Sequence, residues 1–143
     1  MPHEPVTSED ADLVVLRVPA DPGYARVVRL AVSAYAVRLR LVPAEIEDLR
    51  LAVDEALILL LGRRSDGRGP QAQAHSEPMV TLTLDAPGGH PPVLVGLRLD
   101  PTPTTGPDDP SALARFSELI PAGVGVRAVD ATAGVVELQL PAE

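Results

Sequence analysis

Hydrophobic residues in the first half of the chain recur mostly at helical spacing. A short β-rich run, residues 13–18, comes first and predicts a strand that ends at Pro19. Asp21 and Pro22 then have the residue types of a helix start, and an apolar stripe follows them at Tyr24, Val27, Val28, Ala31, Ala34 and Tyr35. Pro43 opens a second predicted helix, whose inner stripe is Ile46, Leu49, Val53, Ala56 and Leu60.

The second half of the chain alternates between apolar and polar positions, which is typical of strands. Two such runs, residues 79–84 and 93–99, flank the Gly- and Pro-rich segment 86–92 and together predict a hairpin. A short helix capped by Ser111 and two last strands are predicted at residues 112–120, 124–128 and 135–140. The order β-α-α-β-β-α-β-β favours an α+β fold, a two-layer α/β sandwich, over a doubly wound fold.

The remaining segments are polar or rich in Gly and Pro. Residues 1–11 are expected to be a disordered tail, followed by one domain over residues 12–143. Residues 65–78 are expected to form a mobile loop, and residues 100–110 to lack regular structure. The sequence contains no signal peptide and no long apolar run, so we expect a cytoplasmic protein without membrane contact.

Composition narrows the class of function. The net charge of −8 argues against nucleic-acid binding, and the absence of Cys excludes disulfides, thiol catalysis and Cys-ligated metals. His3, His75 and His90 are scattered through loop-like segments, so we expect no metal site. The chain contains no Lys and no Asn, whereas Arg, Ala and Pro are frequent, a bias that indicates a GC-rich genome such as an actinobacterial one.

The second predicted helix carries the most informative motif. Asp54 and Glu55 form a carboxylate pair on it, and the segment 49–56, LRLAVDEA, resembles a helix of the anti-sigma factor and serine-protein kinase family of the RsbW and SpoIIAB type. That family belongs to the GHKL (Bergerat) ATP-binding superfamily. The resemblance covers roughly residues 13–140 and is best over residues 24–56. It implies a mixed sheet backed by about three helices, with nucleotide bound between the helix layer and a mobile lid.

The resemblance also identifies what the chain lacks. In the family, a Glu matching Glu55 acts as the base, and an Asn four residues later binds Mg²⁺; here Leu59 takes the place of that Asn. An isobutyl side chain offers Mg²⁺ none of the oxygen ligands that it requires. Asp100 matches an Asp that accepts a hydrogen bond from adenine, but the glycines expected after it are absent. We therefore expect Glu55 and Asp100 to be vestigial and no cofactor to be bound, apart from weak ATP or ADP binding.

Several residues of the two predicted helices are candidates for protein contacts. Arg26 matches a family Arg that contacts both the sigma factor and its antagonist, and Arg29 lies on the same helix outside the apolar stripe. Arg suits such a role because its guanidinium pairs bidentately with carboxylates. Leu57, Leu59 and Leu61 are expected either to fill the former nucleotide space or to form a dimer or partner face. The resemblance further implies a homodimer.

Three hypotheses follow. In the first, the protein sequesters a sigma factor, a STAS-domain anti-anti-sigma partner releases it, and the ATP site is degenerate and inactive. In the second, it is an active serine-protein kinase that phosphorylates a STAS-domain antagonist, with Glu55 as base, Asp100 as adenine contact and Asp108 or Asp109 as the replacement metal ligand. In the third, it is a small-ligand sensor that uses the former nucleotide cleft, lined by residues 57–61.

Overall fold

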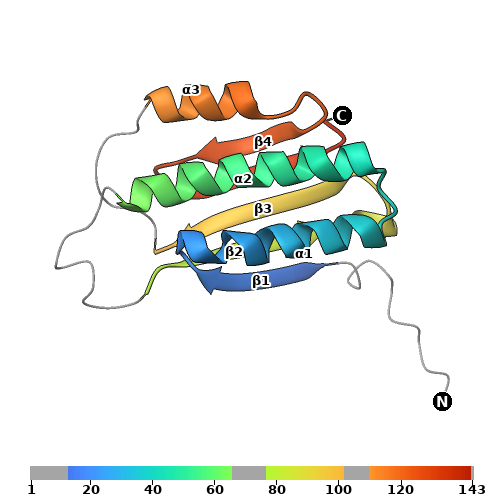
Figure 1. Ribbon diagram of the computed structural model, residues 1–143, viewed down its shortest axis with the longest axis horizontal. Coiled ribbons are helices and arrows are strands. Elements are labelled where there is room, and N and C mark those ends of the chain that lie inside the picture. Colours follow the sequence, from blue (N-terminus) through green and yellow to red (C-terminus); the bar gives the residue numbers. More distant parts are fainter. Residues whose placement is uncertain (1–12, 66–76, 102–109, 143) are drawn as a thin grey trace, which may run out of the picture.

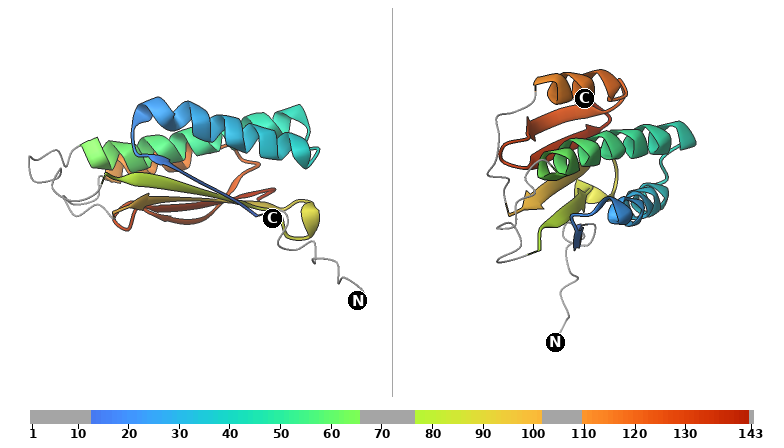
Figure 2. Two further views of the ribbon diagram at one scale, coloured as in Figure 1. Left: turned by 90° about the horizontal axis from the view of Figure 1, so that it is seen from below. Right: turned by 60° about the vertical axis from the view of Figure 1, so that its left-hand side comes forward.

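The computed structural model describes residues 13–65, 77–101 and 110–142. One layer is a five-stranded sheet, and helices cover one of its faces (Figure 1; Figure 2). The strands and α-helices in chain order are β1 Val14–Pro19, α1 Ala25–Arg38, α2 Pro43–Ser65, β2 Met79–Asp85, β3 Val93–Asp100, α3 Pro110–Leu119, β4 Gly125–Asp130 and β5 Val135–Leu140. Two short 3-10 helices, Pro22–Tyr24 and Pro87–Gly89, precede α1 and β3. The predicted order of elements and the α+β two-layer sandwich are therefore confirmed.

The sheet is antiparallel between all neighbouring strands that the structure describes. Its order is β1-β2-β3-β5-β4, and each of the four pairings is antiparallel. The expectation of a mixed sheet is wrong because β5 lies between β3 and β4. The chain crosses from β3 through α3 to the far edge, and β5 then returns as a hairpin strand, so the two strands that run in the same direction never pair.

Alternation along the strands fills the space between the two layers. Leu82 on β2, Leu97 on β3 and Leu138 on β5 each have at most 1% of their surface exposed, and they face the helices. Full burial of a leucine side chain stabilises the fold by about 1.5–3 kcal/mol. The polar residues between them, such as Thr81 and Thr83, point to the opposite face, which no described helix covers.

The stripe predicted for the first helix is partly wrong. Val28 and Tyr35 are buried as expected, but Tyr24, Val27 and Ala34 are exposed. The buried side also contains two residues outside the predicted stripe, Val32 and Ala36. Apolar residues surround much of α1, so periodicity alone did not distinguish its inner side from its outer side.

The second helix lies at the centre of the helix layer. It contacts α1 on one side, α3 on the other, and strands β3 and β5 beneath it (Figure 1). Leu49, Val53, Ala56 and Leu60 of the predicted stripe are fully buried, and Ile46 is half-buried. A helix with neighbours on three sides carries apolar residues over most of its circumference. No helix in the described ranges is long and apolar enough to cross a membrane.

Side-chain carboxylates accept hydrogen bonds from backbone N–H groups at the starts of two helical segments. The Asp21 side chain accepts a hydrogen bond from the backbone N–H of Gly23 at 2.7 Å, as predicted for a cap. Glu45 accepts from the N–H of Val42 at 3.0 Å, which is half of a capping box. The predicted cap at Ser111 is wrong, because α3 already begins at Pro110 and Ser111 lies within its first turn.

The turn between α1 and α2 is a Schellman motif. The N–H of Leu41 donates to the carbonyl oxygen of Ala36 at 3.1 Å, and that of Arg40 donates to Val37 at 2.9 Å. Arg40 has a φ of 61°, in the left-handed region that favours glycine. The motif reverses the chain within a few residues, so α2 runs back beside α1 and brings Asp54 next to Arg29.

Candidate functional site

A cleft separates α2 from α3 on the helix layer. Its volume is about 260 Å³, and it is lined by Glu55, Ile58 and Leu59 from α2 and by Ser111, Ala112, Arg115 and Phe116 from α3. Most of its lining is apolar, and the charged groups are one carboxylate and one guanidinium. It includes Glu55 and Leu59, the two α2 positions that the family resemblance assigns to the nucleotide site.

Glu55 and Leu59 lie one helical turn apart and both face this cleft. Glu55 is half-buried, and its side chain makes no hydrogen bond or ion pair within the ranges that the structure describes. Leu59 is only 5% exposed and belongs to the hydrophobic core. The position where the family places a metal-binding amide therefore holds a buried hydrocarbon, which cannot coordinate a cation.

Ile58 and Glu55 form a ridge between this cleft and a second hollow. The second hollow, about 430 Å³, runs between α1 and α2 and also includes Leu57 and Leu61. The run of leucines on α2 therefore does not line one cavity. Leu59 turns toward α3, whereas Leu57 and Leu61 turn toward α1, because residues two apart on a helix point in widely different directions.

Asp100 lies away from Glu55. It is the last residue of β3, and because Leu99 faces the core, Asp100 points to the opposite face of the sheet. Its side chain is 60% exposed and accepts a hydrogen bond from Arg17 of β1 at 3.4 Å. The two residues expected to contact one nucleotide are therefore not brought together, because strand alternation sends Asp100 to the face that the helices do not cover.

The two candidate arginines on α1 have different surroundings. The guanidinium of Arg29 donates to Asp54 of α2 at 3.0 Å, an ion pair that the sequence did not reveal. Arg26 is exposed, and its side chain has no ion pair or hydrogen bond with the residues that the structure describes. Arg29 therefore joins two helices, whereas Arg26 remains available to a partner.

Replacing Arg29 with alanine is expected to lower the free energy of unfolding by about 0.2–1 kcal/mol, the usual range for a partly exposed ion pair. Urea unfolding at low and high salt measures the effect, which should shrink at high salt because mobile ions screen the charges. Arg26→Ala is the matched control and should leave stability unchanged. If Arg29→Ala and Asp54→Ala have additive effects in a double-mutant cycle, the ion pair does not stabilise the fold.

Metal ligands are not clustered in the described ranges. They contain no group of three or more His, Asp or Glu side chains that could hold a metal ion. His90 lies in the exposed turn between β2 and β3, where its Nδ1 is 3.0 Å from the carbonyl oxygen of Pro91. His3 and His75 lie outside the described residues, as do the expected disordered tail and the loop that contains Asp108 and Asp109.

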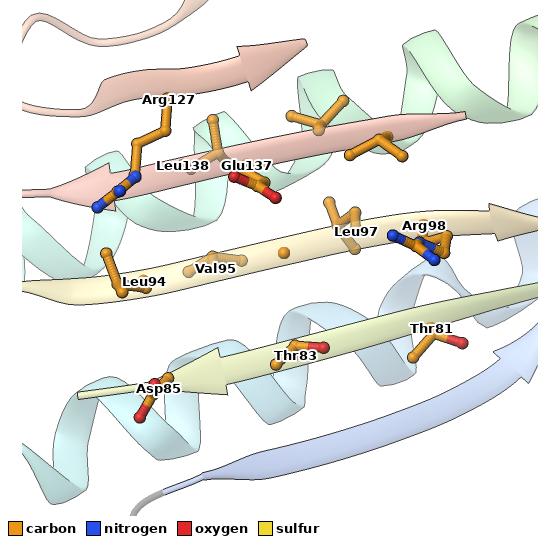
Figure 3. Close-up of a pocket in the computed structure, with 13 residues that line it drawn as sticks. Thr81, Thr83, Asp85, Leu94, Val95, Leu97, Arg98, Arg127, Glu137 and Leu138 are labelled. Carbon is orange, nitrogen blue, oxygen red and sulfur yellow. The ribbon is translucent and has the colours of Figure 1, made fainter. Parts of the chain in front are cut away.

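A groove on the uncovered face of the sheet is a feature that the sequence analysis missed. Its volume is about 500 Å³, and its floor is formed by β3 and β5 (Figure 3). Side chains of both charges extend into it, including Asp85, Arg98, Arg127 and Glu137, and Arg127 donates to Gln139 at 3.0 Å. Gly96 on β3 leaves the middle of the floor open. The alternation of Thr and charged residues along these strands indicates an exposed face of the sheet, but it does not indicate that this face is concave.

Comparison with known proteins finds relatives for one part of the chain, while no family model matches it. The chain is 45% identical over 49 residues to the serine-protein kinase RsbW of Bacillus pumilus, covering 34% of this chain and 30% of that protein. RsbW of Bacillus subtilis is 45% identical over 47 residues, covering 33% and 29%, and RsbW of Bacillus velezensis is 41% identical over 49 residues, covering 34% and 31%. A third of the chain is thus similar to RsbW.

The matched part spans less than a third of the length of these RsbW proteins. The similarity supports the family resemblance that the segment 49–56 suggested. It concerns a stretch of sequence rather than a whole protein, so the activity and the partners of RsbW are matters for proposal in this chain.

Proposed function

We propose that this protein is a regulatory binding module of the anti-sigma type, which sequesters a sigma factor and is countered by a STAS-domain anti-anti-sigma partner. The similarity of a third of the chain to RsbW supports this role, as does the two-layer fold. Buried Leu59 is the single observation that carries the second half of the proposal, namely that the module acts by binding alone and not as a kinase.

A comparison of binding free energies favours a degenerate ATP site without a cofactor. A charge-assisted contact to a metal or phosphate is worth about 1.5–3 kcal/mol, while a micromolar ligand has a total binding free energy of about 8 kcal/mol. This chain lacks the metal-binding amide and the glycines expected after Asp100, and its Asp100 pairs with Arg17 instead. Losses of this size leave little affinity for Mg-ATP.

The mechanism proposed for such a module is occlusion. The sigma factor is held against this protein, so its polymerase-binding surface is unavailable, and the relative concentrations and affinities of the two partners decide which complex forms. Arg26, exposed on α1, is suited to pair bidentately with a carboxylate of either partner. Without phosphoryl transfer, control depends on partner abundance.

We further propose that the module is a homodimer and that the uncovered face of the sheet joins the two copies. A two-fold interface brings the same patch of each subunit together, so the patch must complement itself. The groove meets this requirement because it combines an apolar floor with both charges, since Arg98, Arg127, Asp85 and Glu137 all line it (Figure 3). No described helix covers this face of the sheet.

Titration of the purified protein with Mg-ATP tests the loss of kinase function. We expect no measurable heat by calorimetry and no transfer of label to STAS-domain proteins of the source organism, because the cation lacks its amide ligand. An RsbW kinase from Bacillus serves as the positive control. Binding of Mg-ATP with a Kd below about 10 μM would contradict a degenerate site.

Mixing the protein with the sigma factors of the same organism tests the proposed anti-sigma role. Failure to bind any of them would contradict that role.

The cleft itself favours a second candidate function, that of a small-ligand sensor. Its volume of about 260 Å³ and its mostly apolar lining suit a small apolar molecule with a cationic group placed near Glu55. A thermal-shift screen of small apolar amines, repeated with Glu55→Gln, tests this candidate. The replacement metal ligands that the active-kinase hypothesis requires, Asp108 and Asp109, lie outside the described ranges.

A further inference from the structure

The outward side of α1 carries a stripe of apolar side chains. Val27, Leu30 and Val37 are 42%, 60% and 63% exposed, and exposed Ala34 completes the helical spacing. The outer side of a surface helix is ordinarily polar, because the apolar side is the one that packs on the core. Single exposed apolar residues are common on protein surfaces, but a contiguous row is typical of an interaction site. We define these four residues as the outer stripe.

The charged residues within α1 itself are all positive. The charged residues of α1 are Arg26, Arg29 and Arg38, and the helix has no Asp or Glu. With 3.6 residues per turn, Arg26 and Arg38 fall on opposite sides of the stripe, while Arg29 turns toward α2 and pairs with Asp54. Arg26 and Arg38 therefore place positive charge beside the stripe in a chain whose net charge is −8.

The charge pattern disfavours two alternative occupants. A second copy docked through the same stripe would bring Arg26 and Arg38 of one α1 toward those of the other, and α1 has no Asp or Glu to offset this repulsion. An anionic lipid surface would attract these arginines, but the net charge of −8 repels such a surface over the whole molecule. A protein segment avoids both problems because it can present acidic groups to α1 alone.

We propose that the outer stripe of α1 is the docking surface for an acidic amphipathic helix of a partner protein. The apolar side of that helix packs along Leu30 and Val37, which are the most exposed members of the stripe. Its Asp or Glu residues pair with Arg26, which has no side-chain partner within the described ranges. This inference deepens the proposed function. Which protein supplies the helix depends on that function being correct.

The experiment uses the full chain and a displayed library of amphipathic helical peptides. Apolar positions in the library vary among Leu, Ile, Val and Ala, and flanking positions vary among Glu, Lys and Gln. Selection on the wild-type chain is expected to enrich Glu at the flanks. The double variant Leu30→Ser with Val37→Ser should weaken binding of the selected peptides at least about tenfold, because the apolar contact is lost.

Two control variants test whether peptide binding depends on the outer stripe and on the charge beside it. Leu119→Ser changes another exposed helical leucine, on α3, and should leave peptide binding unchanged. Arg26→Glu should reverse the selection in favour of Lys at the flanks. Circular dichroism checks that each variant is folded, which is expected because the substituted side chains are exposed. Selected peptides that bind the double variant as well as the wild type, or that carry Lys on the wild type, would overturn the proposal.

Two further measurements distinguish this inference from the proposed function. If a sigma factor binds the wild type and the double variant equally, the docking surface is wrong although the anti-sigma role stands. If acidic peptides bind through the outer stripe but no sigma factor binds, the surface stands and the proposed function fails. Binding of the wild type to vesicles of phosphatidylglycerol and phosphatidylcholine, lost in the double variant, would instead assign the stripe to a membrane and overturn the proposal.

Discussion

Replacing Phe116 with alanine is expected to lower the free energy of unfolding by about 3–5 kcal/mol, the range for a large aromatic side chain removed from a core. Phe116 is the only phenylalanine in the chain and is 2% exposed. It is also the one fully buried residue of α3, so its ring fixes that helix against α2. Without it, α3 loses its main contact and the cleft beside Glu55 loses a wall.

Equilibrium urea unfolding, followed by far-UV circular dichroism, measures this effect. Leu119→Ala is the matched control, since Leu119 is at the end of the same helix but exposed, and it should change stability by less than about 0.5 kcal/mol. A loss below about 1 kcal/mol for Phe116→Ala would show that α3 is held in place by other contacts.

Introducing an amide at position 59, where the RsbW-type family resemblance places a Mg²⁺ ligand, is expected to destabilise the protein without creating nucleotide binding. Leu59→Asn should cost about 2–4 kcal/mol, because the substitution removes apolar packing and buries an amide without partners. Leu59 is 5% exposed and faces Phe116 across the cleft, so an amide there would be poorly hydrated. The glycines expected after Asp100 would still be missing, and Asp100 would still point to the other face of the sheet.

Urea unfolding and calorimetric titration with Mg-ATP measure the two outcomes separately. Leu59→Met is the control, because it nearly conserves volume and should cost less than about 1.5 kcal/mol. A stable Leu59→Asn variant that binds Mg-ATP with a micromolar Kd would contradict our interpretation. It would mean that one substitution, and not a rebuilt cleft, separates this protein from a nucleotide-binding relative.

The elements that were predicted well are those whose pattern depends on one neighbouring layer. Strands β2, β3 and β5 alternate because one side of each faces the core, and the sequence alone located them within a residue at each end. The inner stripe of α2 was also recovered. The buried and exposed side chains of α1 were harder to predict, because both the outer stripe and the inner side of this helix are apolar. Periodicity alone does not indicate which of two apolar sides is buried.

For the candidate site too, the sequence predicted relations within one helix but not contacts between separate elements. Position along α2 was enough to place Glu55 and Leu59 on one side of a helix, since four residues make about one turn. No such local rule brings Asp100 and Glu55 together, because they belong to separate layers and to strands and helices far apart in the chain. The pairs Arg29 with Asp54 and Arg17 with Asp100 were missed for that reason.

The sequence by itself determined the elements, their order and the chemistry that Leu59 cannot perform, because these depend on residue type and on repeats of two or 3.6 residues. Only the tertiary structure decided that β5 lies between β3 and β4, that Asp100 faces away from the helices, and that α1 keeps an apolar side exposed. These properties depend on which surfaces meet. Contacts between distant segments depend on the packing of the whole chain, so no local sequence pattern predicts them.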